Sequence, residues 1–334
     1  MVKSFKRILK GNPFHYGSGA HGGQFKPRDF DDDSGGGEDA DQYDRYLSPA
    51  KTRDVEPEPQ RRPTKVYTED AHNLTHIFKQ FENDGCILSA TPDVMAIKWK
   101  NLLPNVHPHE FLRAFFGRDG LTNTNLSQLQ LHINSKDKKI SFGATGDNLT
   151  VHGKQVTDYQ RNLDLKHGFA THSTLQLATA AQGGGTVKKV FKDCIKLYDK
   201  IGVSAVVVYA NIDRGAYSWG KYGYKYAGAE TQSNHQKSIM AALKTVTAKT
   251  ELSPKAKEEK AAIEKVLKNK KPEAIWALVD MKTPELDKAF KGKISKDSDK
   301  SSFIKMLTKD TSWSGQLDLQ KGSPSRNRIE QYIS

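Results

Sequence analysis

Apolar and polar positions follow a clear order between residues 181 and 224. Residues 204–210 (SAVVVYA) are a short apolar run rich in β-branched side chains, which indicates a buried strand. Residues 215–222 predict a short aromatic helix that ends at Gly223. Before the strand, apolar side chains recur on one helix face until Gly202, namely Val187, Val190, Phe191, Cys194, Ile195 and Tyr198. A glycine-rich turn precedes this helix.

The rest of the chain shows three further patterns. Residues 126–177 alternate between apolar and polar side chains, which predicts antiparallel strands joined by polar turns. Residues 251–289 predict lysine-rich helices, and residues 303–319 predict a C-terminal element that packs on the rest. Residues 66–121 predict helices, with an apolar stripe formed by Leu74, Ile77, Phe78 and Phe81.

Composition divides the chain into three parts. Residues 1–65 combine glycine-rich, acidic and proline-rich stretches that cannot bury an apolar core, so we expect a disordered, charge-blocked arm. Residues 66–230 hold the patterned elements of a mixed α/β domain, and residues 231–334 are expected to form a lysine-rich helical extension. A hydrophobic content of 36% fits one compact core with polar extensions better than two full cores.

Charge is distributed unevenly around a net value of +13. Residues 1–28 carry six basic and no acidic side chains, and residues 29–58 carry eleven acidic and three basic ones. Residues 237–309 hold eighteen lysines against ten acidic side chains. The basic blocks allow weak, non-specific contact with nucleic acid, but the interleaving of the lysines with Glu and Ala slightly favours a solvated lysine-rich helical surface.

Two features bear on the compartment in which the protein works. No apolar stretch is long enough to span a membrane, and the N-terminal segment lacks the apolar core of a secretory signal. Cys86 and Cys194 both lie in apolar sequence, which predicts two buried thiols rather than a disulfide. A reducing cytoplasm is therefore expected where the chain is made.

The cluster of His107, His109 and Glu110 suggests metal ligands at first sight. Its spacing across Pro108 does not aim three ligands at one point on a helix. We therefore expect the start of a helix here, and no metal site.

The glycine-rich turn at residues 182–186 carries most of the functional information. A turn that enters a helix leaves backbone N–H groups unpaired, the helix dipole adds positive potential, and glycines permit close approach. Such a turn can bind a diphosphate. The Walker pattern is absent, and Lys188 breaks the dinucleotide-binding pattern. The alternative interpretation is a plain loop between strand and helix.

The stretch resembles the acyl-coenzyme A site of the GNAT acetyltransferase superfamily. That family's loop reads Gln/Arg-x-x-Gly-x-Gly/Ala; Gln182 and Gly185 match it, and Val187 departs from it. Ile201-Gly202, a strand followed by Asn211, and Gly223-Tyr224 also fall where the family has a Leu-Gly pair, a strand with Asn, and Gly-Phe. The segment GAYSWGKYGY resembles GNAT-like domains of tailed-phage structural proteins.

The resemblance implies a fold and a coenzyme site. The fold would be a mixed, mostly antiparallel sheet flanked by helices. The central strand, residues 169–177, would line the centre and bind the pantetheine arm of acetyl-CoA. The implied acetyl-CoA contacts are Thr174, Leu175, Leu177, Gln182, Gly183, Gly184, Gly185, Thr186, Val187, Asn211 and Tyr217.

The acid and base of an acetyl transfer are harder to assign. His172 is the best candidate for the base because an imidazole titrates near neutrality, although a strand histidine held by a hydrogen bond is the commoner case. The family's tyrosine acid corresponds to Trp219, whose indole cannot deliver a proton, and Tyr222 is its neighbour. Asp158, Asp164 and water are the alternatives.

Two hypotheses for function follow from the resemblance. The first is acetyl transfer from acetyl-CoA to an amine, either a small molecule or a host-protein lysine, by a phage-encoded protein in the host cytoplasm or the virion. The second is a non-catalytic virion structural or internal, ejected protein that keeps the GNAT scaffold and contacts other virion proteins. The missing tyrosine favours the second, and the phosphate turn favours the first.

Overall fold

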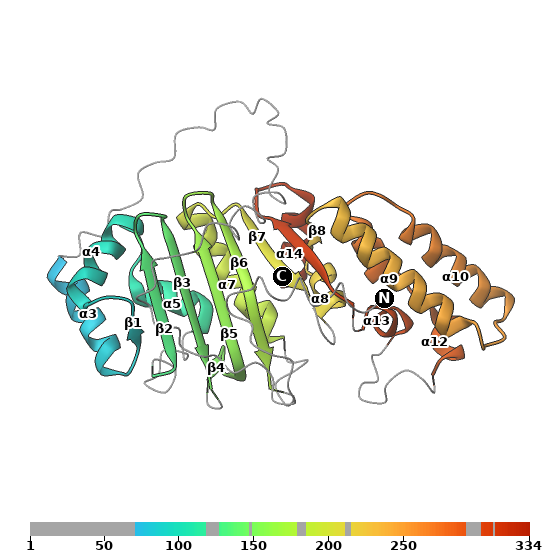
Figure 1. The fold of residues 1–334 in the computed structure, drawn as a ribbon, viewed down its shortest axis with the longest axis horizontal. Coiled ribbons are helices and arrows are strands. Elements are labelled where there is room, and N and C mark those ends of the chain that lie inside the picture. The colour runs from blue at the N-terminus through green and yellow to red at the C-terminus, as the bar shows by residue number, and fades with distance from the viewer. Residues whose placement is uncertain are drawn as a thin grey trace, which may run out of the picture. The chain divides into compact units, whose positions relative to one another are not determined.

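The computed structural model describes residues 71–117, 127–146, 149–178, 185–210, 215–291, 302–309 and 311–334. These residues form a mixed α/β fold around a nine-stranded, mostly antiparallel sheet with helices packed against it (Figure 1). The expected fold class is confirmed at this level. The disordered arm predicted for residues 1–65 lies outside the described residues.

The elements occur in groups along the chain. The first group contains α3 (Ala71–Asn83), β1 (Ile87–Leu88), α4 (Pro92–Leu102) and α5 (Pro108–Phe116). The strands β2 (Leu129–Asn134), β3 (Lys139–Thr145), β4 (Thr150–Val151), β5 (Lys154–Asp164) and β6 (Phe169–Leu177) follow. Next come α7 (Thr186–Ile201), β7 (Ala205–Ala210), α8 (Gly215–Lys221) and β8 (Lys225–Tyr226). The C-terminal group contains α9 (Ala229–Thr247), α10 (Pro254–Leu267), α11 (Ala274–Asp280), α12 (Pro284–Ala289), α13 (Phe303–Thr308), β9 (Trp313–Asp318) and α14 (Pro324–Ile333).

The sheet has the strand order β1-β2-β3-β5-β6-β7-β9-β8, and β4 pairs with β5 at its side. The pairs from β2 to β6 are antiparallel, as are the pairs of β9 with β7 and β8. Strands β6 and β7 are parallel neighbours joined through α7, and β1 and β2 form the other parallel pair. The β6–α7–β7 crossover therefore lies near the middle of the sheet.

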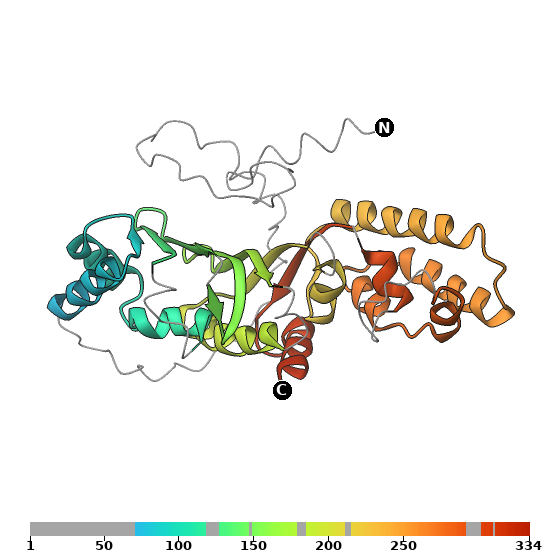
Figure 2. The same cartoon turned by 90° about the horizontal axis from the view of Figure 1, so that it is seen from below.

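One face of the sheet carries the apolar core. Alternate residues of β2, β3, β7 and β9 are buried, as the period of a strand requires when one face is covered. Figure 2 shows that α5, α7 and α14 lie along the same face. On α7 the covered side carries the predicted stripe, with Val190, Phe191, Cys194, Ile195 and Tyr198 all buried.

Residues 231–334 supply both a helical region and a strand of the sheet. Strand β9 lies between β7 and β8, so the second part of the C-terminal element predicted from residues 303–319 is an integral part of the sheet. His235 of α9 connects the helices to the strands through hydrogen bonds to the Tyr226 hydroxyl (2.8 Å) and to Thr311 (2.9 Å). The indole of Trp276 on α11 donates to the carbonyl of Tyr224 at 2.7 Å.

The predicted helix end at Gly202 and the predicted helix start at His107 are both confirmed. Gly202 ends α7 in the left-handed conformation at φ 79°, and Gly168 turns the chain into β6 at φ 70°. His107 is the N-cap of α5, where its Nδ1 accepts from the backbone N–H of His109 at 3.2 Å. Glu110 pairs with Lys200 of α7, so these three residues have structural roles at a helix start.

Candidate functional site

The parallel strands β6 and β7 separate part-way along their length. Their register pairs run from Phe169–Ala205 to His172–Val208, whereas β6 continues to Leu177 and β7 to Ala210. We call the place between residues 173–177 and residues 209–210 the fork. In parallel sheets, ligands bind beyond the carboxyl ends of strands, where the connections to the next helices leave the sheet. The fork is such a place, which makes it the candidate site.

A bulge in β6 marks the start of the fork. His172 lies opposite Arg161 of β5 and Thr174 lies opposite Gln160, so Ser173 is an extra residue in the ladder. A bulge bends its strand and redirects the side chains that follow. The candidate contacts Thr174, Leu175 and Leu177 all lie on β6 beyond this bulge, where the two leucines are half-buried against the core.

The N-terminus of α7 lies at the same end of the parallel pair. Gly185 is its N-cap, in the left-handed conformation at φ 74°, and a side chain added there would meet no atom within 4 Å. The first turn holds no acidic residue, and the buried Thr186 hydroxyl has no hydrogen-bond partner. Val187 is half-buried. Gln182, Gly183 and Gly184 lie outside the described residues, as does Asn211.

His172 is enclosed in the fold. Its side chain is buried, its Nε2 lies 2.6 Å from the Tyr198 hydroxyl, and its Nδ1 has no partner. Burial, with a contribution from the nearby Arg161 charge, holds the pKa of His172 well below its usual range. The imidazole is therefore neutral at physiological pH.

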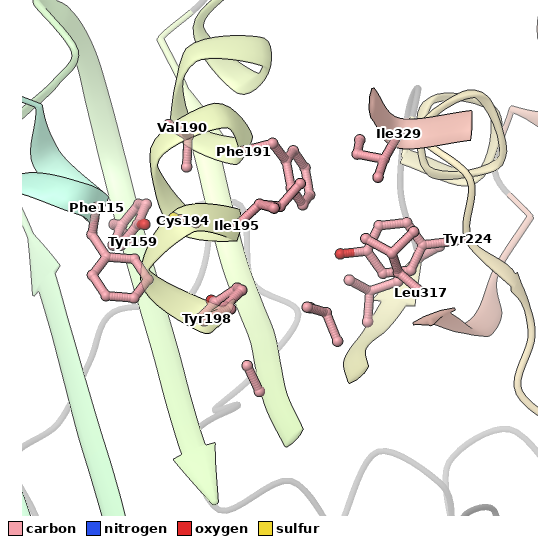
Figure 3. Close-up of a cluster of buried hydrophobic side chains, with 14 of the residues drawn as sticks. Phe115, Tyr159, Val190, Phe191, Cys194, Ile195, Tyr198, Tyr224, Leu317 and Ile329 are labelled. Carbon is pink, nitrogen blue, oxygen red and sulfur yellow. The ribbon is translucent and has the colours of Figure 1, made fainter. Parts of the chain in front are cut away.

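The three catalytic candidates meet around one phenylalanine. Ring centroids of His172, Trp219 and Tyr222 lie 5.6, 6.0 and 5.8 Å from that of Phe191 on α7. Tyr224 completes the group at 6.2 Å (Figure 3). Burial raises the pKa of Tyr222, so its hydroxyl retains its proton at neutral pH.

Two other candidates lie apart from this group. Tyr217 contacts cations instead, with Lys221 Nζ 5.7 Å and Lys305 Nζ 5.3 Å from its ring centroid. Asp164 holds the turn before β6, where its carboxylate accepts from the backbone N–H of His167 at 3.0 Å. That turn is at the end of β6 opposite to the fork.

The sequence interpretation missed Arg161. Its side chain is 1% exposed and its Nη1 donates to the carbonyls of Gln160 (2.7 Å) and Thr174 (2.5 Å). The guanidinium also lies over the Tyr159 ring, 4.3 Å from its centroid. The signal was the alternation of Tyr159, Arg161 and Leu163, which places a charge on the buried face of a strand.

Comparisons with known proteins give no further guidance. Neither the family models, nor the curated proteins, nor the solved structures contain a significant match to this chain. Within the described ranges, no helix has the length and apolar character needed to cross a bilayer. In the same ranges, His, Cys, Asp and Glu side chains do not gather in groups of three that could hold a metal ion.

Proposed function

We propose that the protein is a GNAT-like N-acetyltransferase that binds acetyl-CoA at the fork and transfers the acetyl group to an amine. The observation that carries the proposal is the separation of β6 from β7 after His172 and Val208, with the N-terminus of α7 at the same end. A parallel strand pair that opens toward a helix N-terminus offers both an extended edge and an anion site.

Each part of the coenzyme has a matching feature. The free N–H groups in the first turn of α7 would bind the diphosphate, aided by the positive charges of Lys188 and Lys189. The pantetheine arm would lie along residues 173–177 as an added strand does on a sheet edge. Bound in this way, the arm would bring the thioester close to Ser173, the bulged residue that has no register partner on β5.

The reaction forms a C–N bond and breaks the C–S bond. The amine nitrogen attacks the thioester carbonyl, a backbone N–H of β6 polarises that carbonyl, and the electron pair leaves on sulfur. Trp219 cannot deliver a proton to the thiolate. The buried, neutral His172 and the strongly proton-retaining Tyr222 are poorly matched to proton transfer at neutral pH. Water therefore takes the amine proton and protonates the thiolate in this proposal.

A calorimetric titration with acetyl-CoA tests the proposal, using two matched variants of α7. Gly185 and Gly202 stand at opposite ends of this helix, both are left-handed, and added side chains meet no atom within 4 Å at either place. Gly185→Glu puts a carboxylate where the diphosphate would bind. We therefore expect the affinity for acetyl-CoA to fall at least tenfold, which is a loss of about 1.4 kcal/mol or more in binding free energy. Gly202→Glu introduces similar backbone strain away from the site and should bind as the wild type does. Failure of the wild type to bind contradicts the proposal.

A second function is favoured by the side chains of the site. The enclosed His172 and the indole at Trp219 fit a virion structural or internal protein that keeps the scaffold without turnover. Incubating the protein with acetyl-CoA, an amine panel and host-protein lysines, with release of free thiol as the readout, separates the two. Binding without amine-dependent thiol release, together with the chain in purified particles, supports this second function.

A further inference from the structure

Arg161 is a buried charge that has no counter-charge among the described residues. In the described part of the chain no carboxylate pairs with it, and its Nε has no hydrogen-bond partner. Two backbone carbonyls and the Tyr159 ring are its contacts. A guanidinium has five hydrogen-bond donors. Burying it away from water costs several kcal/mol, and pairing with an anion in good geometry can offset that cost. Such an arrangement fits a site whose anion arrives with a ligand.

The interior around Arg161 holds further buried polar groups that lack a hydrogen-bond partner. The hydroxyls of Tyr159 and Tyr224 are fully buried without a partner, as is Nδ1 of His172. Figure 3 shows the hydroxyl of Tyr224 directed toward α7, which carries Tyr198 and Cys194. Burial raises the pKa of the phenols of Tyr159 and Tyr224, and the charge of Arg161 acts in the opposite direction on both. Arg161 lies over the Tyr159 ring and opposite His172 in the β5–β6 ladder, so these two side chains are its direct neighbours.

Arg161 also lies at the start of the fork. It is opposite His172, the last residue of β6 that pairs with β7, and its Nη1 donates to the carbonyl of Thr174, just beyond the bulge. A thioester bound along β6 would thus end beside this guanidinium. A short acyl chain that continues past the thioester carbonyl would meet the unsatisfied donors.

We propose that the acyl group carries its own carboxylate, and that Arg161 binds it, with the hydroxyls of Tyr159 and Tyr224 as further donors. The ligand class is a coenzyme A thioester of a short dicarboxylic acid, of malonyl or succinyl size. A guanidinium recognises a carboxylate by two parallel hydrogen bonds, which a methyl group cannot replace. This inference rests on the proposed function and narrows its substrate.

The transfer balances without any further reactant. The amine nitrogen forms an amide with the thioester carbon, the C–S bond breaks, and coenzyme A leaves as its thiol after taking a proton from water. The distal carboxylate is unchanged throughout. An amine with a charge of about +1 becomes an amide that carries about −1, so the modification reverses the charge of its acceptor.

The test compares the binding of acetyl-, butyryl- and succinyl-CoA to the wild-type protein by calorimetry. Butyryl and succinyl chains have the same length up to the carboxylate, so their difference isolates the charge. We expect succinyl-CoA to bind about 10- to 100-fold more tightly than butyryl-CoA, the range of a buried charge-assisted hydrogen bond. Arg161→Met should abolish this preference and Arg161→Lys should reduce it. The folding of each variant is checked by circular dichroism.

The outcomes separate the two proposals. Equal binding of butyryl- and succinyl-CoA overturns the carboxylate site and leaves the proposed acetyl transfer intact. Absence of binding by every thioester overturns the proposed function and the carboxylate site with it. A succinyl preference that survives in a folded Arg161→Met protein overturns the assignment to Arg161. If that variant does not fold, the wild-type comparison still decides whether the carboxylate is recognised.

Discussion

His172 Nε2 and the Tyr198 hydroxyl oxygen lie 2.6 Å apart in the interior, joining β6 to the helix that follows it. Both side chains are buried. The contact engages Nε2 of the imidazole, whereas Nδ1 has no hydrogen-bond partner. The pair fixes the ring where β6 and β7 begin to separate. His172 thus holds the fork in shape, whether or not it takes part in chemistry.

Buried neutral histidines make stability depend on pH. Burial lowers the pKa of His172 well below its usual range and that of His235 to about 3. Unfolded histidine has a pKa of about 6.5, so below that pH the unfolded chain binds more protons and the fold loses stability. Each histidine contributes up to about 1.4 kcal/mol per pH unit. Urea unfolding should show a lower free energy of unfolding at about pH 5 than at about pH 7.5.

The matched variant for this prediction is His235→Gln. A glutamine does not titrate, so the variant should lose less stability than the wild type over the same pH interval. The free energy of unfolding of the wild type should continue to decrease toward pH 3, because the pKa of His235 in the folded protein is about 3. A wild-type protein that is equally stable at both pH values would contradict the neutral, buried state of these rings.

The C-terminal helix α14 is held on α7 by one bidentate ion pair. Arg326 Nη1 and Nη2 donate to the two carboxylate oxygens of Asp199 at 3.0 and 2.9 Å, and the arginine side chain is 7% exposed. We expect Asp199→Asn to reduce the free energy of unfolding by about 1–3 kcal/mol, because it leaves a largely buried charge poorly paired.

Glu330→Gln is the control for the ion pair. This carboxylate also contacts Arg326, but its side chain is half-exposed, so its loss should cost less than about 1 kcal/mol. Thermal unfolding of both variants, with limited proteolysis of α14, measures the difference. Equal costs for the two variants would show that Asp199 is not the residue that holds this helix.

Two left-handed glycines should respond differently to the same substitution. A Cβ at Gly223 would lie 2.8 Å from the carbonyl oxygen of Ser325, whereas one at Gly202 would meet nothing within 4 Å. Both positions have positive φ, which costs a non-glycine residue about 1–2 kcal/mol. Gly202→Ala should therefore cost about that much, and Gly223→Ala should cost at least about 1 kcal/mol more. Chemical denaturation checks this, and equal losses would refute the close approach of α14.

Local signals in the sequence predicted many of the elements. The alternation of residues 126–177, the apolar stripe before Gly202 and the cap at His107 depend on neighbours in the chain, and the corresponding elements are present. Strand β1 was not predicted. Strand β1 has only two residues, and it is defined by pairing with β2, about forty residues away.

Long-range pairing accounts for what the sequence did not predict. The position of β9 between β7 and β8 depends on hydrogen bonds to residues about a hundred positions earlier. The candidate site shows the same limit. The glycine turn could be recognised as a sequence motif. That no carboxylate among the described residues pairs with the buried Arg161 is a consequence of the tertiary fold, which the sequence motif does not reveal. The alternation in β5 placed that arginine inward without revealing its partners.

The most direct test of the acyl-CoA proposal is amide hydrogen exchange with and without acetyl-CoA. The account predicts slower exchange at residues 173–177 of β6 and in the first turn of α7, with α10 (Pro254–Leu267) unchanged as an internal reference. The first region would bind the pantetheine arm and the second the diphosphate. Slowed exchange confined to other elements, or no change at saturating acetyl-CoA, would contradict binding at the fork.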